Sequence, residues 1–328
     1  MITRLNSNST NPLNRNFSMF FQHQPRSEQE LKEVVQILNR LSLLYWQPQG
    51  FQSQEYIRSL VGHWREAFKW FLSSYAFERQ GRSPHYSIAA VKAVNKYEAA
   101  LPYPDFEEKV WKDFLISGRF ADDGRGANKK NNPLAPAGGA INSASLLVTS
   151  LEDYDFNIVK WASSLVKSGE IETVWNKLVQ IRGIGSKIAS LFLRDVVYAF
   201  EIDEDKIEKK VYLQPIDVWT ERGARALAQY ISETPKLYWE FAEVLVEVSE
   251  RVNVRSTLTN VGLWTFGAQL VRNPARFHDL LLNVEELHSF LSKQIDWHRE
   301  RAKLLEIVLE YPTGADGERL FAGHRLVN

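Results

Sequence analysis

The chain has 328 residues and carries 40 basic and 40 acidic side chains, so its formal net charge is zero. Attraction of the whole molecule to a polyanion is therefore excluded, and any nucleic-acid site must be a local patch. With 44% hydrophobic and 24% charged residues, the composition is that of a globular protein rather than a disordered or collagen-like chain. The absence of cysteine excludes disulfides, thiolate nucleophiles, cysteine-ligated zinc and a cysteine-bound iron–sulfur cluster.

Length and hydropathy predict the domain organisation. Residues 1–29 are rich in Asn, Ser, Gln and Arg, which predicts a flexible lead-in. No apolar targeting segment or membrane span is recognisable, so we expect a soluble, cytoplasmic protein. The remainder is long enough for two helical lobes, one built from both chain ends (30–66 and 218–328) and one central (67–217).

Helical periodicity dominates the chain. Apolar residues recur at helical spacing from Glu28 onward, and strand signals are limited to residues 209–216, where Pro215 argues against a central strand. The fold class predicted is therefore all-α. The expected helices cover residues 28–45, 56–72, 88 to the prolines at 102 and 104, 106–117, 153–168, 171–181, 187–200, 218–231, 235–252, 257–271 and 284–310.

Residues 117–143 are dense in Gly, Pro, Asn and Ala and have no apolar period, which predicts a long loop. Its basic residues could contact phosphate, but a solvated loop is the favoured interpretation because Asp122 and Asp123 dilute the charge. The basic residues concerned are Arg119, Arg125, Lys129 and Lys130.

A helix, a tight hairpin and a second helix are predicted over residues 171–200. Gly183 and Gly185 allow a sharp turn with positive φ, and Ile184 between them can fill the gap between the two helices. The free amides of such a hairpin, with the positive end of the helix that begins at Ser186 or Lys187, form a place for one anionic group such as a DNA phosphate. The phosphate-binding residues predicted are Gly183, Ile184, Gly185 and Ser186. A dinucleotide fingerprint and a P-loop are excluded, since neither pattern is complete.

The hairpin Ile181-Arg182-Gly183-Ile184-Gly185-Ser186-Lys187-Ile188-Ala189 resembles that of the helix-hairpin-helix superfamily of DNA repair glycosylases, which typically reads Leu-Pro-Gly-Val-Gly-x-Lys-Thr-Ala. The segment from Ile216 to Arg222 is similar to the superfamily's second motif, an apolar residue followed by the catalytic aspartate. The chain departs from the pattern at Arg182, Ile188 and Trp219, and in a longer separation between the two motifs.

The resemblance implies a bifunctional DNA glycosylase and abasic-site lyase, with Lys187 as the nucleophile and Asp217 as its polar partner. Asp203 and Asp205 lie nearer to Lys187 in sequence and are alternatives to Asp217; both fall in the charged segment 201–210, which we expect to be a surface insertion. A lysine attacks the anomeric carbon only as the free amine, so we expect Lys187 to be buried at the positive end of its helix, where that form is favoured.

Because the iron–sulfur members use four C-terminal cysteines, the chain is more similar to the cluster-free branches, which include the 8-oxoguanine glycosylases. The resemblance then implies that Trp264, Phe266 and Gln269 line the pocket for the extruded base. For Trp264 and Phe266 the favoured alternative is ordinary helix core.

The resemblance implies double-stranded DNA containing a damaged base as the partner, without a cofactor. The histidine spacing, the hydropathy and the absence of cysteine predict no metal, no membrane contact and no iron–sulfur cluster, and we expect a nucleoid-associated monomer. Two other functions stay open. The hairpin could serve a non-catalytic DNA-binding module, with Asp217 only a helix cap, or a monofunctional glycosylase could use water and leave Lys187 incidental.

Overall fold

The computed structural model describes residues 27–46, 53–77, 84–122, 124–127, 129–138 and 142–310, and for 301–310 the backbone alone. Within these residues the protein is all-α, as predicted, and extended pairing is limited to one isolated bridge between Asn142 and Ile181. The α-helices are α1 (Glu28–Leu41), α2 (Leu43–Trp46), α3 (Gln54–Ser59), α4 (Trp64–Phe71), α5 (Pro84–Lys96), α6 (Phe106–Ser117), α7 (Ala144–Thr149), α8 (Ile158–Lys167), α9 (Ile171–Val179), α10 (Ser186–Ala199), α11 (Val218–Ala228), α12 (Tyr238–Val252), α13 (Ser256–Trp264), α14 (Pro274–Leu281) and α15 (Val284–Glu310).

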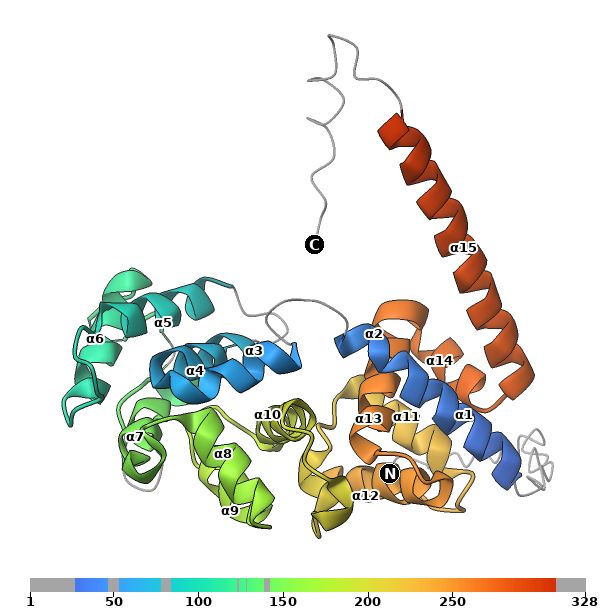
Figure 1. Cartoon of the computed structure of the whole chain (residues 1–328), viewed down its shortest axis with the longest axis horizontal. Coiled ribbons are helices and arrows are strands. Elements are labelled where there is room, and N and C mark those ends of the chain that lie inside the picture. Colours follow the sequence, from blue (N-terminus) through green and yellow to red (C-terminus); the bar gives the residue numbers. More distant parts are fainter. Residues whose placement is uncertain are drawn as a thin grey trace, which may run out of the picture.

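Buried apolar side chains form two hydrophobic clusters. The first runs from Ile57 to Leu213 and joins α3 to α10; the second combines α1 with residues 216–290. Figure 1 shows α10 between these two groups of helices, with α15 projecting away from them. The domain boundaries stay a prediction, although Ile57 and Leu60 pack in the first cluster rather than with α1.

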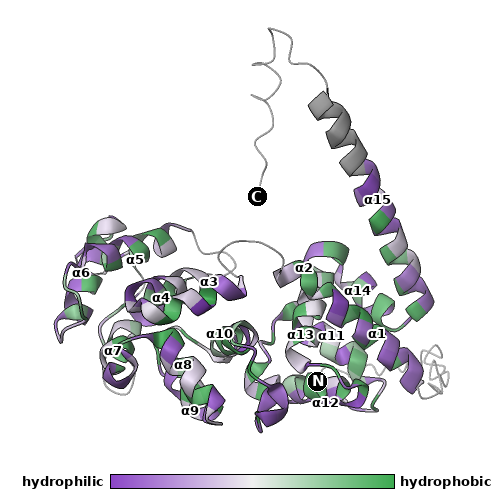
Figure 2. Ribbon diagram, in the orientation of Figure 1, coloured by the Kyte–Doolittle hydropathy of each residue, from purple (hydrophilic) through white to green (hydrophobic). Residues whose placement is uncertain are grey.

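Local sequence explains how the amphipathic helices begin and pack. At α1, Ser27 accepts a hydrogen bond from the Glu30 amide (3.1 Å) and the Glu30 carboxylate accepts one from the Ser27 amide (3.0 Å), which is a capping box. Most helices carry both hydrophobic and hydrophilic residues (Figure 2), so that each helix buries its hydrophobic face. A Cβ at Gly262 would lie 1.9 Å from the Leu38 carbonyl oxygen, so the close approach of α1 and α13 requires glycine.

The structure differs from the predicted elements where tertiary contacts interrupt a helical pattern. The stripe at 56–72 is divided into α3, a 3₁₀ turn and α4, which continues as a π-helix over Leu72–Ala76, and a second π-helix (Thr265–Val271) follows α13. The short helices α7 and α14 were not predicted. Residues 209–216 contain a 3₁₀ turn (Lys210–Leu213) rather than a strand.

The segment 201–210 lies only partly at the surface: its exposed residues fit the prediction, but three others are buried and it is not a simple insertion. The exposed residues are Glu201, Asp203, Asp205, Lys206, Glu208 and Lys209. Ile202 and Ile207 are buried in the first cluster, and the Glu204 carboxylate is 4% exposed. Glu204 accepts hydrogen bonds from Ser256 and Thr257, and thereby caps the start of α13. The segment therefore joins the two halves of the chain.

Two other predictions concern the membrane and the N-terminus. Among the described residues, the structure contains no helix with the length and apolar character that a membrane span needs. The predicted lead-in lies outside the described residues up to position 26, and α1 begins at Glu28.

Candidate functional site

The hairpin between α9 and α10 is built from a short stretch of backbone. Gly183 has φ +76°, the left-handed conformation that favours glycine, whereas Gly185 has φ −105° and ψ 179° and is the N-cap of α10. The expectation of positive φ is therefore confirmed at Gly183 and wrong at Gly185. Ile184 is 4% exposed, so its predicted packing between the helices is confirmed.

The hairpin leaves backbone donors free. Within the described chain, no hydrogen bond is donated by the amides of Gly183, Gly185, Ser186 or Lys187. The Ile184 amide donates to the Ile181 carbonyl (2.9 Å), so the expectation of a free amide there is wrong. Four free N–H groups at the start of a 14-residue helix are a binding place for an anionic oxygen.

Lys187 and Asp217 lie next to each other. Lys187 is the second residue of α10 and Asp217 is the N-cap of α11, and the Lys187 Nζ is 3.6 Å from the Asp217 Oδ2. The Lys187 side chain is 44% exposed and the Asp217 side chain 10% exposed, so the expected burial of Lys187 is wrong. The accessible Lys187 amine lies beside a mostly buried Asp217 carboxylate. In such an arrangement the carboxylate can exchange a proton with the amine, and the amine can attack an electrophile.

The two carboxylate oxygens of Asp217 have different neighbours. Oδ1 accepts hydrogen bonds from the amides of Trp219 (2.9 Å) and Thr220 (3.1 Å), and the Thr220 hydroxyl accepts one from the Asp217 amide (2.6 Å). This reciprocal cap fixes the rotamer of Asp217, so that Oδ2 is left to face Lys187.

Tyr238 supports the backbone that precedes Asp217. Its hydroxyl donates to the Gln214 carbonyl (3.0 Å) and accepts from the Ile216 amide (3.4 Å). Burial raises the pKa of Tyr238, and its hydrogen bond with Ser190 of α10 opposes the rise. Tyr238 was not singled out from the sequence, because its partners are 22 and 24 residues away and follow from the fold.

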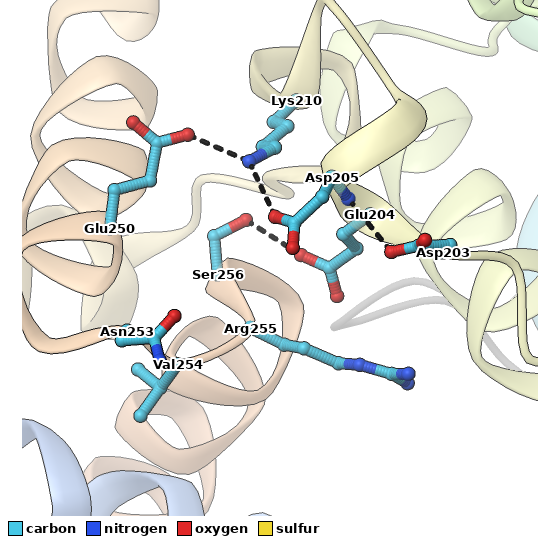
Figure 3. Close-up of a pocket in the computed structure, with 9 residues that line it drawn as sticks. All are labelled: Asp203, Glu204, Asp205, Lys210, Glu250, Asn253, Val254, Arg255 and Ser256. Carbon is cyan, nitrogen blue, oxygen red and sulfur yellow. Dashed lines mark hydrogen bonds and ion pairs between the residues drawn. The ribbon is translucent and has the colours of Figure 1, made fainter.

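The two alternative aspartates have other partners. Asp203 accepts from the Asp205 amide (3.2 Å) and lies 3.7 Å from the Lys206 ammonium. Asp205 and Glu250 both pair with Lys210, at 3.3 and 2.8 Å. Figure 3 shows this ammonium between the two carboxylates. These residues line a polar cavity of about 320 Å³. Of the three candidate aspartates, Asp217 is the one that the structure brings to Lys187.

The three base-pocket candidates are in different environments. Phe266 is fully buried in the second cluster, against Phe277 and Phe290. Its environment is therefore ordinary helix core, the alternative to a role in the base pocket. Gln269 is exposed. Trp264 is half-buried and its ring meets that of Tyr45 edge-on at 5.6 Å.

A buried polar network lies further along α10. Arg194 and Asp195 are 3% and 1% exposed; the Arg194 Nε donates to the Asp195 carboxylate (2.9 Å) and its terminal nitrogen to the Asn260 side chain (3.1 Å). The Tyr75 hydroxyl donates to the same carboxylate (3.0 Å). Burial raises the pKa of Tyr75 well above its usual value, and the Asp195 charge adds to the rise. The signal in the sequence was an Arg-Asp pair inside an apolar helix.

Comparison of the chain with protein-family models, with curated proteins and with solved structures finds no match. Within the described residues, no cluster of three or more His, Cys, Asp or Glu side chains is arranged to hold a metal ion.

Proposed function

We propose that the protein is a DNA base-excision repair enzyme, a bifunctional DNA glycosylase and abasic-site lyase that removes an oxidised base, with 8-oxoguanine as the first substrate to test. The observation that carries the proposal is the pairing of Lys187 with Asp217 at 3.6 Å, directly after a hairpin with free amides. The resemblance to the helix-hairpin-helix glycosylases supports the same assignment, since both of its motifs meet here.

In the proposed reaction the hairpin amides of Gly183, Gly185 and Ser186 hold a phosphate next to the damaged nucleotide. The Lys187 amine attacks the anomeric carbon, the bond from that carbon to the base breaks, and the base departs with the bonding electron pair. Asp217 accepts the proton that the amine loses and stabilises the positive charge that develops on the sugar. The lysine and the opened sugar form a Schiff base, and loss of a sugar proton then expels the 3′ phosphate by β-elimination.

The proposal also requires two helical lobes with a cleft between them, in which the base leaves the duplex and is held. The division of the buried residues into two clusters supports this arrangement. Trp264 and Tyr45 supply aromatic faces beside α10, where the Tyr45 ring centroid is 5.2 Å from the Arg194 guanidinium carbon. They are the rings on which we expect an extruded base to stack.

A second candidate is a non-catalytic DNA-binding module. It is favoured by one observation, that Asp217 caps α11 through Oδ1 and so has a structural role that needs no chemistry. In that case Lys187 contacts phosphate from the first turn of α10, and the hairpin supplies the remaining contact.

Borohydride trapping separates the candidates. Incubation of the protein with an abasic-site duplex and borohydride yields a stable covalent complex only when a Schiff base forms. We expect trapping by the wild type, none by Lys187→Ala or Lys187→Gln, and duplex binding by all three proteins. Duplex binding without trapping by the wild type would refute the lyase and leave the binding module and the monofunctional glycosylase, which release of the free base from a damaged duplex then separates.

The Asp217 variants separate catalysis from capping. Asp217→Asn retains the acceptor oxygen for the cap and loses the charge, so we expect stability to be kept and excision to fall by about two to four powers of ten. Asp217→Ser retains a cap with no carboxylate and serves as the matched control for stability. Excision at the wild-type rate by Asp217→Asn would remove this residue from the reaction.

A further inference from the structure

Arg182 joins the hairpin to the loop that precedes α7. Its terminal nitrogens donate to the carbonyls of Lys129 and Pro136, both at 3.3 Å. The Arg182 amide donates to the Asn142 carbonyl (2.9 Å) and the Asn142 amide to the Gln180 carbonyl (3.0 Å). The second half of the loop is therefore held against the hairpin at Lys129, Pro136 and Asn142, although about fifty residues separate Lys129 from Arg182.

The part of the loop that Arg182 holds carries two adjacent cations. Lys129 and Lys130 lie in a 3₁₀ turn (Lys129–Asn131), and both side chains are exposed. Neither forms an ion pair with a carboxylate of the described residues, whereas lysines elsewhere, such as Lys209 and Lys210, do. Among the described residues the turn thus presents two cations without an ion-pair partner, and Arg182 connects it to the hairpin that carries the free amides.

A charge pattern of this kind fits a polyanion with regularly spaced charges. The chain has no net charge, so affinity for DNA must come from local contacts, and the hairpin supplies only one anion-binding place. A second cationic group close to the hairpin amides would hold the same DNA strand at a second point. Two contacts fix the direction of the strand across the hairpin. A plain solvated loop needs no arginine bridge to the hairpin.

We propose that the Lys129–Asn131 turn is a second phosphate-binding element, which contacts the DNA backbone beside the phosphate held by the hairpin, and that Arg182 is the residue that positions it. This inference rests on the proposed function, since it assigns a further DNA contact to the same site. It gives a role to an arginine at a place where the helix-hairpin-helix glycosylases typically have proline.

The experiment measures the salt dependence of binding to an undamaged duplex, with trapping on an abasic duplex as a parallel readout. The test variant is Lys129→Ala with Lys130→Ala, and Lys129→Arg with Lys130→Arg preserves the charge. Loss of one or two phosphate contacts makes the slope of log affinity against log salt less negative by about 0.9 or 1.8. That corresponds to roughly eightfold weaker binding per contact at about 0.1 M salt.

Arg182→Met keeps the aliphatic stem and removes the bonds to the turn, so we expect weaker binding although both lysines remain. The matched control is Lys32→Ala with Lys293→Ala, which removes two exposed lysines without ion-pair partners among the described residues, from α1 and α15. The control should bind as the wild type does, and so should the double arginine variant.

Each outcome decides the inference. An unchanged slope in the double alanine variant, with a wild type that binds and is trapped, would overturn the second contact and leave the proposed function intact. An equal loss in the Lys32 and Lys293 control would show a general charge effect and also overturn it. A wild type that does not bind DNA at all would refute the proposed function, and the inference with it.

Discussion

The two hairpin glycines should differ in their response to alanine substitution, because their backbone conformations differ. Gly183 has φ +76°, and at this angle the Cβ of an alanine would lie too close to the following carbonyl oxygen. Gly185 has φ −105°, which any residue adopts, and a Cβ built there has no atom within 4 Å. A comparison of Gly183→Ala with Gly185→Ala therefore isolates backbone conformation from side-chain volume.

The expected magnitudes follow from these angles. Gly183→Ala should lower the free energy of unfolding by about 1–2 kcal/mol, the cost of a left-handed L-residue. At Gly185, alanine restricts the unfolded chain, a gain of about 0.4–1 kcal/mol. Alanine is also a poorer N-cap than glycine by a similar amount, so the net change should be near zero.

Urea denaturation of the two variants measures the stabilities, and duplex binding measures the function of the amides. We expect Gly185→Ala to keep its stability and to bind every DNA sequence more weakly, because the new Cβ stands at the start of α10 where a phosphate must approach. Equal destabilisation by the two variants would refute the backbone argument. Unchanged binding by Gly185→Ala would refute the phosphate site.

Three further predictions concern the residues behind the site. Asp195→Ala leaves the buried Arg194 guanidinium without its carboxylate and should cost about 3–5 kcal/mol of stability, measured by denaturation. Burial raises the pKa of Tyr75, so above about pH 10 the unfolded chain releases a proton that the folded protein keeps. The free energy of unfolding should therefore fall as the pH rises above about 10, and it should fall less steeply in Tyr75→Phe. Tyr238→Phe should slow trapping by loosening the backbone before Asp217, with a stability loss of only about 1 kcal/mol.

Matched controls use similar groups at the surface. Glu247→Ala breaks the exposed pair with Arg251 and should cost less than about 0.5 kcal/mol, so a comparable loss would contradict the role given to burial at Asp195. Tyr212→Phe removes a hydroxyl that bonds Glu172, away from Asp217, and should leave trapping unchanged. Slower trapping in Tyr212→Phe as well would show that the Tyr238 effect is not specific.

Features encoded within a few consecutive residues could be predicted from the sequence. The order of helices follows from apolar spacing, and the hairpin follows from Gly183, Ile184 and Gly185 between two apolar helices. The pairing of Lys187 with Asp217 came from the resemblance, and the geometry then selected Asp217 over the nearer Asp205.

Features that depend on distant partners could not be predicted. From the sequence, Arg182 and Glu204 are expected to be surface residues. In the structure Arg182 donates to the carbonyls of Lys129 and Pro136, and Glu204 accepts a hydrogen bond from Ser256. The π-helical segments likewise could not be predicted from the spacing of apolar residues, because the helix changes its winding there while that spacing continues.

The structural and the catalytic interpretations of Asp217 do not compete for the same atom. Capping occupies Oδ1 and needs no charge, so serine or asparagine would satisfy α11 equally well. What capping leaves unexplained is Oδ2, which the fixed rotamer directs toward the Lys187 ammonium, on a different helix and 30 residues earlier in the chain. The cap therefore orients the second oxygen, since the carboxylate is held through Oδ1 by two backbone amides and by the Thr220 hydroxyl (3.2 Å). A residue that only begins a helix has no need to present a charge to the first turn of α10, and the half-exposed lysine it faces is the group that the proposed reaction requires to be accessible.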